Sequence, residues 1–200
     1  MNHYFTDNKN LKSAETKTEY IFGSERFVFI TDAGVFARDG VDGATDVLLR
    51  CLPKITAGAR VLDIGCGYGA AGVVLSRIYG AGIEVVMSDV SERALGLARR
   101  NLTLNGAEAE VAHSDGFENL TGNFDYIIFN PPIHAGKSVI YNIYETSRGY
   151  LKPGGALYVV ARRKHGAESH KKKLEEIYGA ENCAVVYSKK GIFVYNLRKG

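Results

Sequence analysis

RVLDIGCGYGAAG, residues 60–72, is the stretch that decides the fold. It opens with a short apolar segment typical of a buried strand, and its glycine-rich loop leads into an apolar segment with helical spacing. From there to the end of the chain, short apolar runs alternate with amphipathic segments. Strands that alternate with helices predict a mainly parallel sheet with helices on both faces.

The alternation predicts five strands, four helices and a final hairpin. Ser91 is a natural N-cap for the second helix and Gly106 is its stop signal. The two last strands surround Lys189-Lys190-Gly191 and make one edge of the sheet antiparallel. We expect strands at 60–64, 83–89, 109–115, 125–129 and 155–161, helices at 70–80, 91–106, 138–151 and 167–179, and the hairpin within 183–199.

The amino-terminal part of the chain has a different pattern. Residues 1–19 are polar, and we expect a flexible lead-in. EYIF-GSE-RFVFI then predicts a hairpin of aromatic and β-branched strands. After a glycine-containing loop, ATDVLLRCLPKI (44–55) has helical periodicity, with the helix expected to end near Pro53. We therefore divide the chain into the lead-in, a hairpin and helix packed on the main domain (20–58), and the main domain itself (59–200).

Composition excludes several classes of protein. Of 200 residues, 46% are hydrophobic and 24% are charged, which are ordinary values for a globular domain. Cys51, Cys66 and Cys183 are far apart, so we expect neither a disulfide framework nor a metal site. With no signal-peptide pattern and no apolar run of membrane-spanning length, we expect a soluble, cytoplasmic protein without membrane contact.

Polar or unusual residues follow most of the predicted parallel strands. In such sheets, ligands bind outside the carboxyl ends of the strands, near the point where the strand order reverses. We therefore expect these residues to form one site. They are DIGCGYG after the first strand, Asp89 after the second, Asp115 after the third, Asn-Pro-Pro (130–132) after the fourth and RRKHG (162–166) after the fifth.

The glycine loop fits two ligand classes. GYGAAG satisfies the dinucleotide pattern G-x-G-x-x-G, with Asp89 about twenty residues further on, while the run from Asp63 through Gly65 and Gly67 to Gly69 gives D-x-G-x-G-x-G. The Asp63 carboxylate would repel a pyrophosphate and attract the ammonium and sulfonium groups of S-adenosylmethionine. The loop therefore favours S-adenosylmethionine over NAD and over a glycine turn without a ligand. Asp89 would accept the two ribose hydroxyls.

Asn-Pro-Pro then fits a catalytic shelf better than a plain turn. A residue before proline is held in an extended conformation, so Asn130 and Pro131 present their carbonyl oxygens in fixed directions. Two hydrogen bonds from an exocyclic or amide nitrogen, to the Asn130 side-chain oxygen and the Pro131 backbone oxygen, would turn its lone pair toward the methyl group. Such a shelf acts by orientation and electrostatics and needs no strong base.

DIGCGYGAAG, SDVSERALGLARRNLTLNG, SDGFE and FDYIIFNPPIHAGK resemble the methyltransferase small-domain family, over roughly residues 20–198. Its best-known members are small-subunit ribosomal RNA guanine-N2 methyltransferases. The resemblance implies an α/β, Rossmann-like class I methyltransferase fold with a seven-stranded sheet. It also implies a catalytic motif of Asn130, Pro131 and Pro132, and cofactor binding by the glycine loop, by Asp89 and by Asp115, which is placed to accept from the adenine amine.

Two departures from the family are visible. Members often carry an aromatic residue after the second proline, which stacks on the target base, and this chain has Ile133 there. Many relatives also have a duplicated amino-terminal domain, for which we expect no room in this chain. Phe36, between the hairpin and the main domain, either covers the cofactor or packs in the fold.

Several residues near the expected site are candidates for substrate binding, together with Ile133. His134 would shuttle a proton or stack on a base, and Lys137 would meet a phosphate or cap the next helix. Arg162, Arg163 and Lys164 leave the fifth strand on the same edge and would bind phosphates. For His134, and for Arg162, Arg163 and Lys164, the alternative is a solvated side chain.

We therefore expect an S-adenosylmethionine-dependent N-methyltransferase that acts on an exocyclic guanine nitrogen of small-subunit ribosomal RNA, with the RNA or the small ribosomal subunit as its partner. One alternative is N-methylation of a protein glutamine amide, as in release factors, on a similar Asn-Pro-Pro shelf. Another is an RNA-binding protein that holds the cofactor without turnover.

Overall fold

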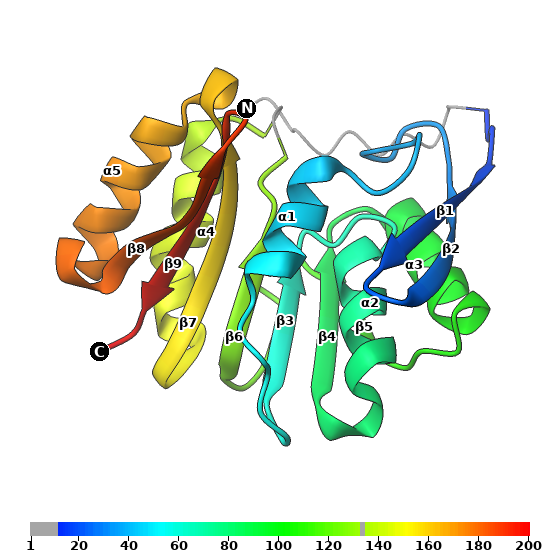
Figure 1. The fold of residues 1–200 in the computed structure, drawn as a ribbon, viewed down its shortest axis with the longest axis horizontal. Helices are drawn as coiled ribbons and strands as arrows, with labels where there is room; N and C mark the ends of the chain where they lie inside the picture. The colour runs from blue at the N-terminus through cyan, green and yellow to red at the C-terminus, as the bar shows by residue number, and fades with distance from the viewer. Residues whose placement is uncertain (1–11, 133–134) are drawn as a thin grey trace.

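A seven-stranded sheet with the order β5-β4-β3-β6-β7-β9-β8 forms the centre of the computed structural model (Figure 1), which describes residues 12–132 and 135–200. The first five strands of this sheet are parallel, and β9 runs antiparallel to both β7 and β8. This confirms the predicted Rossmann-like architecture. The strands are β3 (Arg60–Ile64), β4 (Glu84–Asp89), β5 (Glu110–His113), β6 (Phe124–Phe129), β7 (Leu151–Arg162), β8 (Cys183–Lys189) and β9 (Ile192–Arg198).

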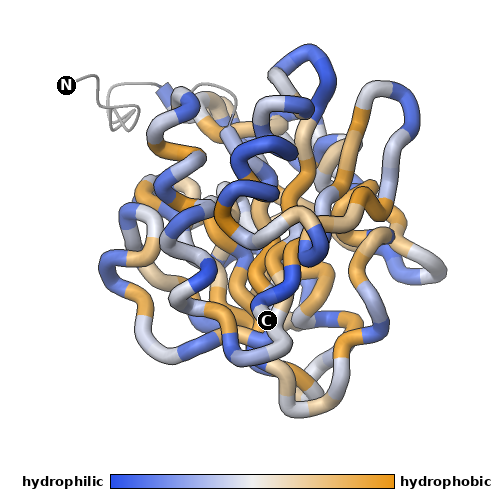
Figure 2. Tube along the Cα trace, turned by 90° about the vertical axis from the view of Figure 1, so that its left-hand side faces the viewer, coloured by the Kyte–Doolittle hydropathy of each residue, from blue (hydrophilic) through white to orange (hydrophobic). Residues whose placement is uncertain are grey.

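Helices cover both faces of the sheet. On β6, Ile128 packs in the core under α1, α2 and α3, while Ile127 and Phe129 pack in the core under α4 and α5. Hydrophobic segments lie inside and hydrophilic ones outside in Figure 2. The helices are α1 (Gly43–Cys51), α2 (Ala70–Tyr79), α3 (Glu92–Leu104), α4 (Lys137–Tyr150) and α5 (Ala167–Tyr178), with short 3-10 turns η1 (Gly80–Gly82), η2 (Arg163–His165) and η3 (Ala180–Asn182). No helix of the described residues is long and apolar enough to cross a membrane.

Element ends follow local chemistry. The expected helix at 44–55 ends at Cys51, because Leu52 precedes a proline and takes an extended conformation. β7 begins at Leu151, four residues earlier than expected, since Leu151 already pairs with Phe124 of β6. Ser91 caps α3 as predicted, accepting from the Ala94 amide at 3.3 Å.

The amino-terminal hairpin is a separate two-stranded sheet of β1 (Thr16–Phe22) and β2 (Glu25–Thr31). β1 starts within the expected lead-in, because residues 16–19 already pair with β2 from the Thr16–Thr31 pair onward. The first eleven residues of that lead-in lie outside the described residues. The hairpin therefore starts earlier than its aromatic pattern indicated.

Two asparagines, Asn101 of α3 and Asn105 just after it, join this hairpin to the main domain. The Asn101 amide donates to the Ile30 carbonyl at 2.9 Å and accepts from the Ile30 amide at 2.7 Å. Asn105, one turn later, makes the same pair of bonds with Val28. Asn101 also donates to the carbonyl of Tyr68, in the glycine loop, at 2.9 Å. One buried side chain thus connects the hairpin, α3 and the glycine loop.

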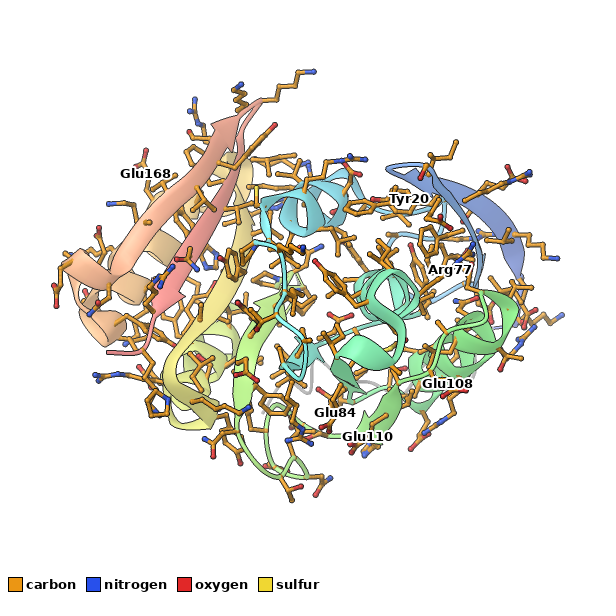
Figure 3. The ribbon with its side chains drawn as sticks, turned by 60° about the horizontal axis from the view of Figure 1, so that its bottom comes forward. Tyr20, Arg77, Glu84, Glu108, Glu110 and Glu168 are labelled. Atoms are coloured by element: carbon orange, nitrogen blue, oxygen red, sulfur yellow. The ribbon has the colours of Figure 1, made fainter. Side chains whose placement is uncertain are left out.

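Side chains at the hairpin surface add further attachments. The Tyr20 hydroxyl donates to Asp46 of α1 at 2.6 Å, and Arg77 of α2 pairs with Glu25 at 3.0 Å. Figure 3 shows Tyr20 and Arg77 on the side of the molecule where the hairpin meets the helices. The hairpin is therefore attached to α1 and to α2 as well as to α3.

Candidate active site

The carboxyl ends of the central strands lie level with one another. Ile64, the last residue of β3, pairs with Ser88 of β4 on one side and with Phe129 of β6 on the other. The chain runs outward from β3 through β4 to β5 and then returns to β6, so the strand order reverses beside β3. A cavity of about 730 Å³ opens at this point, where such sheets bind their ligands.

The glycine loop lines this cavity, which is called the larger cavity below because a smaller one lies beside it. Gly65 and Gly67 have φ angles of +68° and +57°, which favour glycine. A Cβ at Gly67 would meet nothing within 4 Å, so the open side of the loop faces free space. The Gly67 amide also donates to Asp89 Oδ2 at 2.9 Å, which holds the loop against the end of β4.

Asp63 is buried at the end of β3 and caps α2. Its Oδ2 accepts from the Gly72 amide at 2.8 Å, in the first turn of that helix. Burial raises the pKa of the Asp63 carboxyl to about 7, and the charge of nearby Asp89 adds to the effect. Asp63 also lines the larger cavity, so a cationic ligand there would favour its ionised form.

Gly69 has a clear packing role. It has a φ of +90°, precedes α2, and does not line the larger cavity. A Cβ at Gly69 would lie 2.5 Å from Met87 Cε and 3.2 Å from Ala98 Cβ. The glycine therefore lets α2 approach β4 and α3 closely, and its contact with the cofactor stays a prediction.

The acids that follow β4 and β5 differ in placement. Asp89 lines the larger cavity, and its two oxygens accept from the Gly67 and Ser91 amides, both at 2.9 Å. Burial raises its pKa. Asp115 is exposed and outside the cavity lining, which its neighbours Ser114 and Gly116 provide instead. The structure thus does not bring Asp115 into the site as expected.

The larger cavity is acidic. Asp42, Asp63 and Asp89 line it, and no lysine, arginine or histidine of the described residues does. Tyr68 also lines it with a buried hydroxyl that has no hydrogen-bond partner among the described residues. Asp42 is paired with Arg162, whereas no salt bridge within the described residues engages Asp63 or Asp89. Such carboxylates disfavour a pyrophosphate and suit a positively charged ligand that carries hydroxyl groups. The donor set therefore fits S-adenosylmethionine and not a dinucleotide.

Asn130 follows β6 and is oriented by α1. Its amide nitrogen donates to Thr45 Oγ1 at 3.0 Å and lies 3.5 Å from Asp42 Oδ2. Asp42 is also the N-cap of α1, accepting from the Ala44 amide at 3.1 Å. Because a carboxylate only accepts hydrogen bonds, the Asn130 nitrogen must face α1. The Asn130 side-chain oxygen therefore points away from Thr45 and Asp42.

A smaller cavity of about 220 Å³ lies on the other side of the Asn-Pro-Pro segment. Asn130 lines both cavities, Pro131 lines the smaller one and Pro132 the larger one. The Pro132 carbonyl accepts from the Ala135 amide at 3.2 Å. Neither the Asn130 side-chain oxygen nor the Pro131 carbonyl accepts a hydrogen bond from the parts of the chain that the structure describes. Within the described ranges, two acceptors without a donor thus lie where the two cavities meet.

The predicted cationic residues separate into two groups. Lys137, the first residue of α4, is exposed, and together with Arg162 it lines the smaller cavity. Arg162 pairs with Asp42 at 2.5 Å, so its charge is already engaged and it supports the α1 N-cap rather than offering a free cation. Arg163 and Lys164 are exposed and line neither cavity.

Two of the predicted substrate-binding residues, Ile133 and His134, lie outside the described residues. As for metals, the described ranges 12–132 and 135–200 contain no group of three or more histidine, cysteine, aspartate or glutamate side chains that would hold an ion.

Sequence reasoning missed the contribution of α1. Asp42 precedes a helical pattern and so had the signal of an N-cap, but nothing in the sequence paired it or Thr45 with Asn130, more than eighty residues away. Phe36 was weighed without a decision, and the structure places it in the lining of both cavities.

Comparison with known proteins gives a consistent result. The family described as "Methyltransferase small domain" matches residues 26–196. The uncharacterized protein YbxB of Bacillus subtilis is 34% identical over 200 residues, covering 98% of both chains. The ribosomal RNA small subunit methyltransferase C of Pasteurella multocida is 40% identical over 132 residues, which are 64% of this chain and 40% of that protein.

Among solved structures, a T. thermophilus 16S rRNA N2-guanine methyltransferase, in complex with AdoMet and guanosine, has a TM-score of 0.83 and 29% identity. The match covers 95% of this chain and 52% of that one. The chain thus spans about half the length, or less, of the ribosomal RNA methyltransferases that it matches.

Proposed function

The chain belongs to the methyltransferase small-domain family, whose cofactor is S-adenosylmethionine, and from that premise we propose that it methylates an exocyclic guanine nitrogen of small-subunit ribosomal RNA. When bound, the cofactor supplies an electrophilic methyl group on a sulfonium centre. The larger cavity is where this chain would hold it, with Asp63 near the cationic groups and Asp89 at the ribose hydroxyls. The loop of Gly65 and Gly67 allows close approach of the backbone.

One observation carries the chemistry: the orientation of Asn130. Thr45 and Asp42 hold the amide nitrogen, so the amide oxygen and the Pro131 carbonyl are available to accept N–H bonds from the substrate. An exocyclic amine is a poor nucleophile because its lone pair is delocalised into the ring. Two such bonds would hold the amine so that its lone pair points at the methyl group. The contribution is positioning and electrostatics, prepared before the substrate arrives.

Ribosomal RNA is favoured over a protein amide by the relatives. Both the P. multocida protein and the T. thermophilus structure carry small-subunit ribosomal RNA in their names. The smaller cavity, which Asn130 and Lys137 line, offers space for an acceptor group beside the proposed shelf. Arg163 and Lys164 provide exposed cations on the same edge of the sheet, where a phosphate backbone would run.

The test uses methyl-labelled S-adenosylmethionine with naked 16S ribosomal RNA, assembled small subunits and a release factor in separate reactions. We expect label in RNA, at a guanine, from the naked or the assembled substrate. Label in the release factor alone would reject the RNA proposal in favour of a protein glutamine. No label in any substrate, with cofactor binding intact, would favour a protein that holds the cofactor without turnover.

A matched pair of variants tests the shelf itself. Asn130→Ala should leave the cofactor Kd unchanged and reduce single-turnover methylation about a hundredfold or more, as expected when an interaction acts mainly in the transition state. Asn123→Ala alters the same residue type immediately before β6, at the opposite end of the strand, and should keep full activity. Equal loss of cofactor binding and turnover in Asn130→Ala would make this residue a structural turn.

A further inference from the structure

Phe36 occupies an unusual place between the two cavities. It comes from the loop between β2 and α1, and it lines the larger and the smaller cavity, as do Asn130 and Ile140. The residue is 48% exposed, which is high for a phenylalanine. Since it lines both cavities, a ligand in either cavity could contact it.

The smaller cavity is where Phe36 meets the proposed acceptor site. Val160 of β7 and His170 of α5 also line this cavity, together with Asn130 and Pro131. Asp89 and Ser114, at the ends of β4 and β5, line only the larger cavity. Phe36 and Asn130 therefore lie where the two cavities meet, whereas the residue proposed to bind the ribose lines one of them.

The loop that carries Phe36 is held in a defined shape. Thr31 Oγ1 donates to the Arg38 carbonyl at 2.6 Å, and the Gly40 amide donates to the Ala37 carbonyl at 3.2 Å. Ala37, next to the ring, has a φ of +58°, a left-handed conformation that costs free energy in a residue other than glycine. Such conformations cluster at ligand clamps, where the surrounding contacts maintain them.

We propose that Phe36 is the ring on which the acceptor base stacks while its exocyclic amine lies against Asn130. The inference rests on the proposed function, since it requires a planar acceptor, and it names the surface that recognises this acceptor. A base that leaves the helix no longer stacks on its neighbouring bases, and the face of an aromatic side chain replaces part of that lost stacking. An aliphatic residue in this place would cover the cavity but offer no stacking face.

The chain contains no tryptophan, which allows a direct binding test. Phe36→Trp places one indole at the proposed stacking surface, and guanosine monophosphate is then titrated in the presence of S-adenosylhomocysteine. We expect saturable quenching of the tryptophan fluorescence, stronger with guanosine than with uridine monophosphate. Val186→Trp is the matched control, because Val186 is 45% exposed and lies on β8, the far edge of the sheet. It should show linear, collisional quenching only.

Kinetics give the second measurement. Phe36→Leu keeps an apolar side chain at this position but removes the aromatic ring on which the base would stack. The KM for the RNA substrate, the one that accepts the labelled methyl group, should then rise about 5- to 150-fold, the range for loss of one base–aromatic stack. The cofactor Kd should be unchanged, and Phe36→Tyr should restore the wild-type KM. An unchanged KM in Phe36→Leu, or identical quenching in the two tryptophan variants, would overturn the stacking site.

Failure of the stacking site and failure of the proposed function give different results. If the wild type methylates no RNA, the proposed function fails, and the quenching titration alone decides whether a base stacks at Phe36. If the wild type methylates RNA and Phe36→Leu weakens the cofactor Kd as much as it raises KM, the ring is a cover for the cofactor and the inference is wrong.

Discussion

The affinity for S-adenosylmethionine should depend on pH through Asp63. This buried carboxyl has a pKa of about 7, so its ionised fraction falls from about ten elevenths at pH 8 to about one eleventh at pH 6. If the cationic cofactor binds the ionised form, its apparent Kd should be about tenfold weaker at pH 6 than at pH 8. Binding at the lower pH should also release close to one proton from Asp63.

Asp63→Asn isolates this effect. The amide keeps an oxygen that can accept from the Gly72 amide, so the cap of α2 should remain. Titration calorimetry at pH 6, 7 and 8 is carried out on both proteins, in two buffers of different ionisation enthalpy. Asp89 and the cofactor's own amine are present in both proteins, so the ratio of the two Kd values reports Asp63 together with its coupling to Asp89. That ratio should change about tenfold between pH 6 and 8.

The Asp63 carboxyl should also make the free energy of unfolding depend on pH, and this dependence has the opposite direction to that of cofactor affinity. The folded protein holds the Asp63 proton up to about pH 7, whereas the unfolded chain releases it near pH 3.8. Without cofactor, the free energy of unfolding should therefore fall as pH rises from about 4 to 7, relative to Asp63→Asn. A cofactor Kd with the same pH dependence in both proteins would refute the reasoning. Asp63 would then be only a helix cap.

Three further predictions address positioning, packing and RNA contact. Thr45→Val keeps the side-chain shape but removes the acceptor for the catalytic amide, so single-turnover methylation should slow by up to about tenfold. An equal loss of cofactor affinity would contradict a positioning role. Gly72→Ala places a Cβ 2.4 Å from a methionine of β4 and should lower the free energy of unfolding in urea by about 1–3 kcal/mol. Gly96→Ala, where α3 has open space, should not destabilise, and equal effects would reject the packing argument. Changing Arg163 and Lys164 to Ala should reduce the slope of log K against log salt for RNA by roughly 0.7–0.9 for each phosphate that the variant no longer neutralises, and an unchanged slope would mean that both are merely solvated.

The sequence was most informative where local chemistry decides the structure. The Ser91 cap, the stop at Pro53 and the turn at Lys190-Gly191, with φ angles of +51° and +73°, all follow from the residues present. Short apolar runs that alternate with helical segments likewise predicted the five parallel strands, and the turn residues predicted the antiparallel hairpin at the edge. The start of β1 was missed, since its first residues are polar and join the strand through pairing alone.

The site was predicted less completely because contacts distant in sequence decide it. The strand-end rule brought Asp63, Asp89 and Asn130 together correctly. It could not tell that Asp115 turns outward, nor that Arg162 is neutralised by Asp42, 120 residues away. Those outcomes depend on the position of α1 and of short loops, for which periodicity carries no signal.

The two asparagines that join α3 to the hairpin have a consequence for how this sequence can change over time. Their hydrogen bonds to β2, from Asn101 and Asn105, are all made to main-chain atoms of that strand. Substitutions along β2 therefore leave these bonds intact, provided that the strand keeps its backbone path. A change at Asn101 instead removes the bonds to β2 and to the glycine loop at once. This attachment therefore constrains Asn101 and Asn105 but not the side chains of β2, which only core packing constrains at Phe27 and Phe29.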